Sequence, residues 1–167
     1  MLRIAVLGCG RIGQMHAANV ARHPRATLAT VYDLHAPSAE RVAAAQGVTA
    51  AASPEAVFAS PDVDAVLIAT ATPTHADYIE MAVAAGKAVL CEKPIDLNLA
   101  RVNACAARIA GTSVPIQLGF NRRYDPGHSA ARAAVLAGDI GELHQVIITS
   151  RDPALPPRAY LEAAGGL

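Results

Sequence analysis

The chain has 167 residues, of which 53% are hydrophobic and 17% are charged. This length and composition fit one well-buried domain with a small appendage, and they exclude an intrinsically disordered chain. The formal net charge is zero, so nothing points to nucleic acid or to an anionic membrane as a partner. We therefore expect a small-molecule ligand.

The cysteines and the first residues predict a cytoplasmic protein. Cys9, Cys91 and Cys105 are odd in number and match no zinc or disulfide spacing, so we expect reduced thiols and no metal site. The apolar run 2–7 is too short for the core of a signal peptide. Because no apolar run reaches the roughly 18 residues that a membrane span needs, we expect no membrane association.

Short apolar runs alternate with helical patterns over the first 118 residues. We expect strands at 2–7, 27–32, 65–69, 88–91 and 115–118, and helices at 11–22, 36–46, 75–85 and between a cap at Asp96 or Asn98 and Gly111. The run 65–69 has no polar alternation, which is typical of a strand covered on both faces. The alternation predicts an α/β fold with a doubly wound parallel sheet.

The pattern changes after Gly119. Asp125-Pro126 is a typical cap and first helical position, and it predicts a helix that runs to about Ala137. The segment 143–150 is β-rich, and the proline-containing stretch 153–167 is expected to be a loop. A lone strand must pair with another sheet, so we expect a homo-oligomer that covers this edge.

The segment 8–13 reads Gly8-Cys9-Gly10-Arg11-Ile12-Gly13 and matches G-x-G-x-x-G between the first strand and the first helix. Gly8 permits a tight turn, Gly10 lets a pyrophosphate approach the backbone, and Gly13 lets helix and strand pack closely. The helix N-terminus adds free N–H groups and a partial positive charge. We therefore predict a Rossmann-type nucleotide site that includes Arg11 and Ile12; the alternative is a glycine turn without a ligand.

Asp33 ends the second strand, twenty positions after Gly13. A carboxylate at this place accepts hydrogen bonds from the adenosine ribose and repels a 2′-phosphate. Neither Leu34 nor His35 is an arginine that would hold such a phosphate. The spacing therefore favours NAD over NADP as the cofactor, and the alternative is an ordinary surface aspartate.

Lys93 lies in the segment Cys91-Glu92-Lys93-Pro94, directly after a predicted buried strand. Strand ends of open α/β sheets face the ligand crevice, where a partly buried lysine can donate to a substrate hydroxyl or oxyanion. Glu92 can orient the lysine or touch the cofactor ribose, and we guess a cis bond at Pro94. The alternative is a solvated lysine at the start of a loop, and Cys91 is expected to be only a small buried side chain.

Two more segments follow predicted strands. In the segment 70–75 we expect Thr74 to cap the next helix, and His75 lies in its first turn, where the helix dipole favours a neutral ring. His75 can contact the nicotinamide ribose, or it is only a helix-start residue. Farther along, the adjacent Arg122 and Arg123 suit a polyhydroxyl or anionic substrate, although we expect one of them to be a simple surface arginine.

Four motifs, G-C-G-R-I-G, A-T-P-T-H, C-E-K-P and G-F-N-R-R-Y-D, occur in this order. Over roughly residues 2–151 the sequence resembles the glucose–fructose oxidoreductase / inositol dehydrogenase (Gfo/Idh/MocA) family, most of all its inositol 2-dehydrogenases. The resemblance implies an NAD-dependent oxidoreductase that oxidises a secondary alcohol of a polyol or sugar by hydride transfer to nicotinamide.

The resemblance also implies roles for single residues. Lys93 would be the catalytic lysine that hydrogen-bonds the reacting hydroxyl, Arg122 would also bind the substrate, and Asp33 would bind the adenosine ribose. The nicotinamide side would be lined by Thr70, Pro73, His75, Glu92 and Lys93.

Members of the family are considerably longer, and their second domain supplies an Asp-x-x-x-His element whose histidine is the general acid and base. The resemblance implies an NAD-binding domain at 1–120, a connecting helix region at 121–142, and at 143–167 the start of a truncated α+β substrate and oligomerisation domain whose first strand is 143–150. Three functions stay open: a polyol dehydrogenase, a non-catalytic NAD-binding module, and an enzyme that uses bound NAD internally, as in redox-assisted glycoside hydrolysis.

Overall fold

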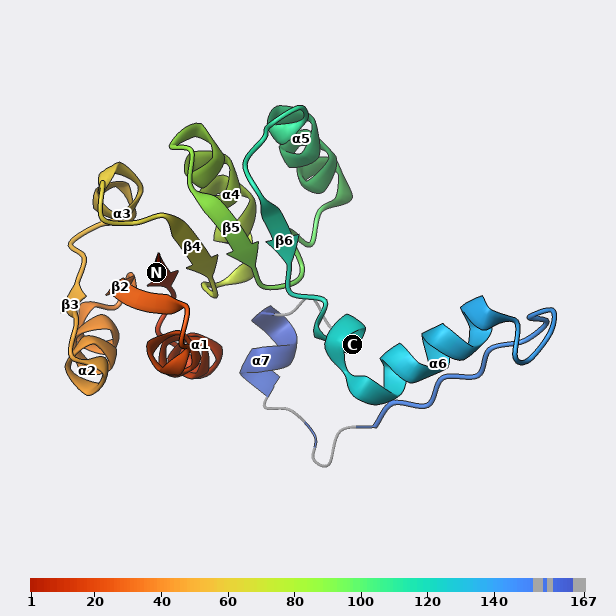
Figure 1. Cartoon of the computed structure of the whole chain (residues 1–167). Helices are drawn as coiled ribbons and strands as arrows, with labels where there is room; N and C mark the ends of the chain where they lie inside the picture. Colours follow the sequence, from red (N-terminus) through yellow and green to blue (C-terminus); the bar gives the residue numbers. More distant parts are fainter. Residues whose placement is uncertain (152–154, 156–157, 164–167) are drawn as a thin grey trace. The chain divides into compact units, whose positions relative to one another are not determined.

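The structure is a computed structural model that describes residues 1–151, 155 and 158–163 (Figure 1). The chain divides into two compact units, Met1–Gly119 and Phe120–Leu167. The first unit holds the sheet with its helices, and the second holds further helices.

A six-stranded parallel sheet forms the centre of the first unit, in the order β3-β2-β1-β4-β5-β6. Its strands are β1 (Leu2–Leu7), β2 (Ala26–Tyr32), β3 (Thr49–Ala50), β4 (Ala65–Ile68), β5 (Ala88–Cys91) and β6 (Ile116–Leu118). This order is that of a doubly wound Rossmann-type sheet, and it confirms the predicted α/β class. The strand order reverses between β1 and β4, where such sheets bind ligands beyond the carboxyl ends of the strands.

Five α-helices and a short 3-10 helix connect the strands. They are α1 (Arg11–Arg22), α2 (Ala36–Gln46), α3 (Pro54–Ala59), η1 (Thr72–Thr74), α4 (His75–Ala84) and α5 (Leu99–Ile109). The side chain of Asn98 caps α5, as predicted, by accepting a hydrogen bond from the Ala100 N–H at 2.9 Å. Helix α3 is not among the expected helices, although Ser53-Pro54 is a typical cap and first position. None of the described helices is long and apolar enough to cross a membrane.

Helices cover both faces of the sheet, with α1 and α2 on one face and α3, α4 and α5 on the other (Figure 1). Successive strand residues point to opposite faces, so Val6 and Leu67 pack with α1 and α2, whereas Leu7 and Ile68 pack with α4. All four residues of β4 are buried, which confirms the prediction of a strand covered on both faces.

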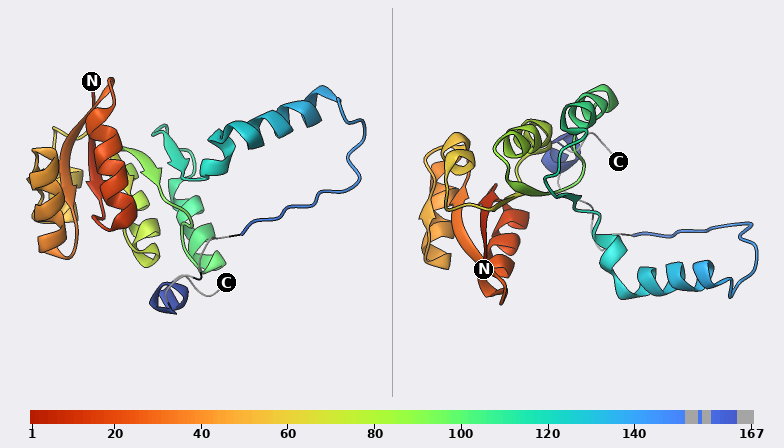
Figure 2. Two further views of the ribbon diagram at one scale, coloured as in Figure 1. Left: turned by 90° about the horizontal axis from the view of Figure 1, so that it is seen from below. Right: turned by 45° about the horizontal axis from the view of Figure 1, so that its top comes forward.

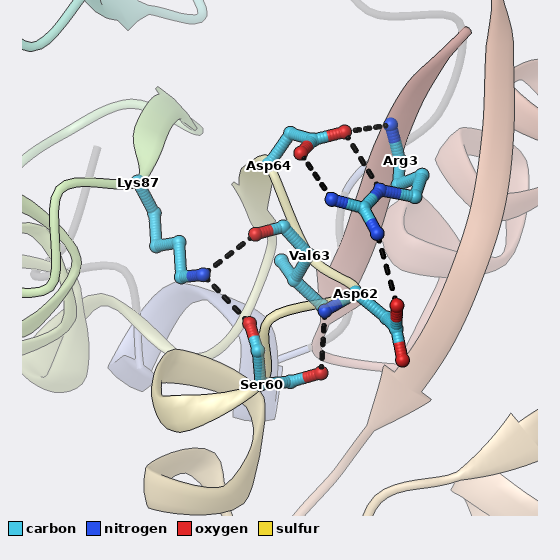
Figure 3. Close-up of polar contacts among 6 residues, drawn as sticks. All are labelled: Arg3, Ser60, Asp62, Val63, Asp64 and Lys87. Carbon is cyan, nitrogen blue, oxygen red and sulfur yellow. Dashed lines mark hydrogen bonds and ion pairs between the residues drawn. The ribbon is translucent and has the colours of Figure 1, made fainter.

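The amino ends of the strands are joined by polar contacts (Figure 3). The guanidinium of Arg3 donates to both carboxylate oxygens of Asp64, at 3.1 and 2.7 Å, and the Arg3 backbone N–H donates to Asp64 at 2.8 Å. The Lys87 Nζ donates to the carbonyls of Ser60 and Val63, each at 2.7 Å. Lys87 is therefore a structural residue at the edge of the sheet opposite the predicted site.

The second unit contains η2 (Asn121–Tyr124), α6 (Pro126–Ala137) and α7 (Arg158–Ala163). Asp125 caps α6, as predicted, by accepting from the His128 N–H at 3.0 Å. The segment 143–150, predicted as a strand that must join another sheet, runs extended after α6 (Figure 2) and pairs with no described strand, so its pairing stays a prediction. The homo-oligomer that we inferred from it stays a prediction.

The predicted loop 153–167 is wrong where α7 lies. The remaining positions of that prediction, apart from residue 155, lie outside the described residues.

Candidate functional site

Hydrogen bonds extend the sheet beyond the last residue of four strands and fix the loops that follow them. Each donor is the first residue after a strand, and each acceptor is the carbonyl of the last residue of a neighbouring strand. The bonds run from Gly8 N to Tyr32 O (2.7 Å), Ala69 N to Leu7 O (2.7 Å), Glu92 N to Ile68 O (2.8 Å) and Gly119 N to Cys91 O (2.7 Å). The predicted site residues of these loops therefore lie along one edge of the sheet.

The three glycines of the fingerprint have different surroundings. Gly8 has a φ of +95°, which favours glycine, and a Cβ there would collide with the Ala69 carbonyl. A Cβ at Gly13 would collide with the Gly8 carbonyl. Gly10, in contrast, has no atom within 4 Å of where its Cβ would stand. Gly8 and Gly13 therefore serve the turn and the packing, whereas the space beside Gly10 is open to a ligand.

Helix α1 begins directly after Gly10 and presents an open N-terminus. Gly10 offers no side-chain cap, and the first turn contains no acidic residue. The first backbone N–H groups of a helix have no partner within the helix, and together with the helix dipole they favour an anion. The exposed Arg11 and half-buried Ile12 belong to this turn. A pyrophosphate fits the chemistry of this cradle.

Asp33 lies beside the glycine-rich loop. Its Oδ2 accepts a hydrogen bond from the Cys9 N–H at 2.6 Å, and its Oδ1 accepts from the His35 N–H at 2.8 Å. Both contacts hold the half-buried carboxylate at the end of β2, while Leu34 and His35 are exposed. A carboxylate held this close to a pyrophosphate cradle can accept hydrogen bonds from the ribose hydroxyls of a bound dinucleotide.

The thiols near the site are buried and protonated. Burial, and secondly the charge of Asp33, raises the pKa of Cys9 to about 11. Burial, and secondly the charge of Glu92, raises the pKa of Cys91 to about 12. Because the thiolate is the nucleophile, neither cysteine is suited to attack a substrate, and the expectation that Cys91 is a small buried side chain is confirmed.

A cleft of ≈ 690 Å³ opens at the carboxyl ends of β1, β2 and β4, within the size range of about 300–1,000 Å³ that is typical of cofactor sites. Its lining includes four of the predicted residues, namely Gly8, Gly10, Asp33 and Thr70. Tyr32 and Tyr78 also line it, and the sequence reading missed both. Tyr78 in α4 follows Thr74, the residue before this helix, by four positions, a spacing that would have placed the two on one face.

Hydrogen bonds of Thr70 and Thr74 hold the loop that follows β4. The hydroxyls of Thr70 and Thr74 lie 2.7 Å apart, and the Thr74 hydroxyl donates to the Ala71 carbonyl at 2.9 Å. The prediction that Thr74 caps α4 with its side chain is wrong, because this hydroxyl closes the preceding turn instead. Pro73 is exposed within η1.

His75 is buried, with 2% of its surface exposed. Its Nδ1 lies 2.7 Å from the carbonyl oxygen of Pro94, and its Nε2 lies 3.0 Å from that of Thr70. Both ring nitrogens are therefore engaged with backbone oxygens. The structure places His75 between the loops that follow β4 and β5, and it is not among the residues that line the cleft.

Glu92 and Lys93 follow β5 and differ in their surroundings. The Oε1 of Glu92 lies 2.8 Å from the Nε2 of His16 on α1, a partner that the sequence reading missed. His16 occupies the helix face of Ile12 and Val20, and a polar residue between apolar ones was the signal. Lys93 is exposed, so the expected partial burial is not found, and the guessed cis bond between Lys93 and Pro94 is confirmed.

Arg122 belongs to the second unit. It is exposed in η2 and lines a cavity of ≈ 560 Å³ together with Arg123, His128, Ser129 and Arg132. Both of the adjacent arginines therefore face the same cavity. Guanidinium groups suit a polyhydroxyl or anionic molecule.

The chain is similar to known oxidoreductases. Residues 2–120 match the family model described as "Oxidoreductase family, NAD-binding Rossmann fold". The inositol 2-dehydrogenase of Rhizobium meliloti (strain 1021) is 46% identical over 166 residues, which are 99% of this chain and 50% of that protein.

Solved structures give the same result. A myo-inositol dehydrogenase from Corynebacterium glutamicum is 46% identical, with a TM-score of 0.91 over 99% of this chain and 50% of that one. A scyllo-inositol dehydrogenase from Lactobacillus casei, solved with bound NAD(H) and scyllo-inositol, is 31% identical, with a TM-score of 0.81 over 85% of this chain and 43% of that one.

The chain spans about half the length of these relatives. The family model covers β1 to β6 and includes the glycine-rich loop, Asp33 and the loops after β4 and β5. The chain therefore belongs to the Gfo/Idh/MocA oxidoreductase family, and residues 2–120 are its NAD-binding Rossmann fold.

Proposed function

We propose that the chain supplies the NAD-binding part of an NAD-dependent dehydrogenase that oxidises a secondary alcohol of inositol or a related polyol, and that its first unit holds the NAD. The observation that carries the proposal is the open backbone at Gly10, at an uncapped helix N-terminus, with the Asp33 carboxylate beside it. Such a site suits a diphosphate joined to a ribose. The names of the inositol dehydrogenases that it resembles support the substrate class.

The strand order suggests which part of the cofactor each residue would contact. From β2 through β1 to β4 and β5, the sheet edge carries Asp33, the glycine-rich loop, Thr70 and Glu92 in turn. In the proposed arrangement Asp33 holds the adenosine ribose and the first turn of α1 holds the pyrophosphate. The nicotinamide side then lies toward Thr70 and Glu92, together with Pro73 and His75. When bound, NAD supplies the acceptor for the hydride.

Lys93 and Arg122 act on the substrate in this proposal. An ammonium group carries three donors and no acceptor, so Lys93 after the end of β5 is suited to donate to the oxygen of the hydroxyl group whose carbon loses the hydride. The planar guanidinium of Arg122 can donate two parallel hydrogen bonds, which suits a pair of neighbouring ring hydroxyls.

A second candidate is a module that binds NAD without turnover. One observation favours it: within the described part of the chain, the exposed Lys93 has no hydrogen-bond partner, and so no base is joined to it. NADH binding that persists without activity, even when a complete homologue supplies its own second domain, would support this candidate.

Binding of the reduced cofactor to the Asp33 variants tests the proposal. We expect saturable NADH fluorescence with the wild-type chain and clearly weaker NADPH binding. Asp33→Ala should lower NADH affinity about tenfold, since it removes a charge-assisted hydrogen bond, and Asp33→Ser should raise the affinity for NADPH relative to NADH. The ratio of the two affinities is insensitive to a general loss of stability.

Asp139→Ala serves as the matched control, because Asp139 is an exposed carboxylate of the second unit. It should leave both affinities unchanged. The proposal is wrong if NADH gives no saturable signal, or if Asp33→Ala binds NADH as tightly as the wild type.

A further inference from the structure

Two histidines contact the segment around Lys93 from opposite faces of the sheet. His16 comes from α1, whose Ala17 and Val20 pack on one face. His75 comes from α4, whose Ile79 packs on the other. His16 reaches the Glu92 carboxylate at 2.8 Å, and His75 reaches the Pro94 carbonyl at 2.7 Å. The residues immediately before and after Lys93 are thus each held by a histidine.

Both contacts are partly buried. The side chains of His16 and Glu92 are 18% and 25% exposed, and His75 is 2% exposed. Hydrogen bonds in a low-dielectric environment are stronger than those in water, and a buried polar group left without its partner is costly. These contacts therefore restrain the segment more strongly than fully exposed contacts would.

Gly119, which follows β6, leaves room for the Glu92 side chain. A Cβ at Gly119 would lie 3.2 Å from the Oε2 of Glu92 and 3.3 Å from its Cα, so a larger residue at this position would crowd the carboxylate. Glu92 is held through its backbone N–H, which donates to the Ile68 carbonyl, and through its side chain, which contacts His16.

Lys93 itself is exposed and has no hydrogen-bond partner in the described part of the chain. Its four-carbon side chain is flexible, so the backbone of its neighbours determines where its ammonium group can reach. His75 adds a second link, because its Nε2 contacts the carbonyl of Thr70, a residue of the cleft.

We propose that His16 and His75 are positioning residues that hold the Glu92–Pro94 segment and so place Lys93 at the nicotinamide side of the cleft. The inference rests on the proposed function, because it assigns Lys93 a place beside the cofactor. Groups of a functional site are effective only when their supporting contacts fix them. Neither histidine needs to touch the cofactor for this role.

The sequence offers a direct probe, because Lys87 and Lys93 are its only lysines. Reductive methylation with ¹³C-formaldehyde therefore gives two lysine signals in an NMR spectrum. The Lys87 Nζ is held by the Ser60 and Val63 carbonyls, so its signal is the internal reference. ADP-ribose, which lacks nicotinamide, probes the adenosine side of the cleft separately from NADH.

Each variant weakens one of the two histidine contacts that hold the segment. His16→Leu and His75→Phe keep an apolar side chain of substantial size, and Glu92→Gln disturbs the first pair from its other member. His16→Gln is the rescue variant, because its amide retains an N–H donor. His144→Leu is the matched control, since His144 is an exposed residue of the second unit.

In the wild type we expect NADH to shift the Lys93 signal. In His16→Leu, His75→Phe and Glu92→Gln we expect at least half of that shift to be lost and NADH affinity to fall about tenfold. The affinity for ADP-ribose should change less than twofold, which a general loss of structure would not produce. His16→Gln should restore most of the shift, and His144→Leu should match the wild type.

A Lys93 shift and an NADH affinity of wild-type size in all three variants would overturn the positioning role and leave the proposed function intact. Equal losses of affinity for NADH and for ADP-ribose would also overturn the positioning role, because the effect of the substitutions would then not be local to Lys93. No saturable NADH binding by the wild type would overturn the proposed function and the positioning role with it.

Discussion

Gly10 and Gly13 belong to one motif, but the space around their Cα atoms differs. Gly10 has a φ of −69°, which any residue adopts, and open space where a Cβ would stand. We expect Gly10→Ala to fold with an unchanged Tm and to bind NADH at least about tenfold more weakly, because the methyl group would stand where the pyrophosphate approaches. Thermal unfolding followed by NADH titration measures both effects.

Gly13→Ala is the contrasting variant. A Cβ there would collide with the Gly8 carbonyl, so we expect it to lower the Tm or to prevent folding. NADH binding of wild-type strength by folded Gly10→Ala would contradict the assignment of the pyrophosphate to this loop.

Local sequence patterns predict those site residues that lie directly after a strand or close to its end. Gly8, Gly10, Asp33 and Thr70 line one cleft because parallel strands end at the same edge of a sheet. The contact between His16 and Glu92 joins residues 76 positions apart, so it depends on how α1 packs over the sheet. The burial of His75 and the exposure of Lys93 do not follow from the spacing of residues in the sequence. Both depend on how the helices pack over the sheet.

At the scale of elements, periodicity predicted the long helices and central strands well. Strands β1 and β5 and helices α1 and α2 match the expected bounds, because apolar faces and glycine ends are encoded locally. The two-residue β3 and the six-residue α3 are too short for a periodic signal. The segment 143–150 has β-forming residues, yet a strand also needs a partner, which the described chain does not offer.

The contact of Arg3 with Asp64 joins β1 to the start of β4. Because of this contact, we expect the stability of the fold to depend on pH in the acidic range. The hydrogen bond from Arg3 holds the pKa of Asp64 far below its ordinary value. Folding therefore favours the ionised carboxylate, and this contribution is present above the unfolded pKa of about 3.9 and is lost as the pH falls below it. We expect Asp64→Asn to lower the Tm at neutral pH, and the difference from the wild type to shrink below about pH 4.

Asp62→Asn is the control for this prediction. Its carboxylate also contacts Arg3, but its side chain is 83% exposed, and exposed ion pairs contribute little to stability. Its Tm should stay close to that of the wild type at every pH. A Tm difference between Asp64→Asn and the wild type that is the same at neutral and acid pH would show that the charge of Asp64 is not involved.

At the scale of the whole molecule, the two units differ in how much they bury. Every residue of the two hydrophobic clusters lies in the first unit. Helix α6 has no buried residue, and Leu136 is 68% exposed. Because burial of apolar surface is the main source of stability, the first unit holds most of the stability that the described residues provide, and NAD binding belongs to this part of the chain.

This division leads to a prediction for the 167-residue chain: it binds NADH but oxidises myo-inositol at a negligible rate. Removal of a hydride from an alcohol also requires a base for the hydroxyl proton. The family resemblance assigns that role to a histidine in Asp-x-x-x-His, a spacing that occurs nowhere in the sequence. The ring nitrogens of His75 are both engaged with carbonyl oxygens, so His75 is poorly placed to replace it.

NADH formation from NAD and myo-inositol, followed by absorbance, measures this turnover. Binding is measured on the same sample, so that an inactive chain is distinguished from an unfolded one. Rapid oxidation would contradict the prediction and make Lys93 the first residue to test as the base. In that case Lys93→Met should abolish turnover and Lys87→Met should not, because Lys87 is held at the opposite edge of the sheet by Ser60 and Val63.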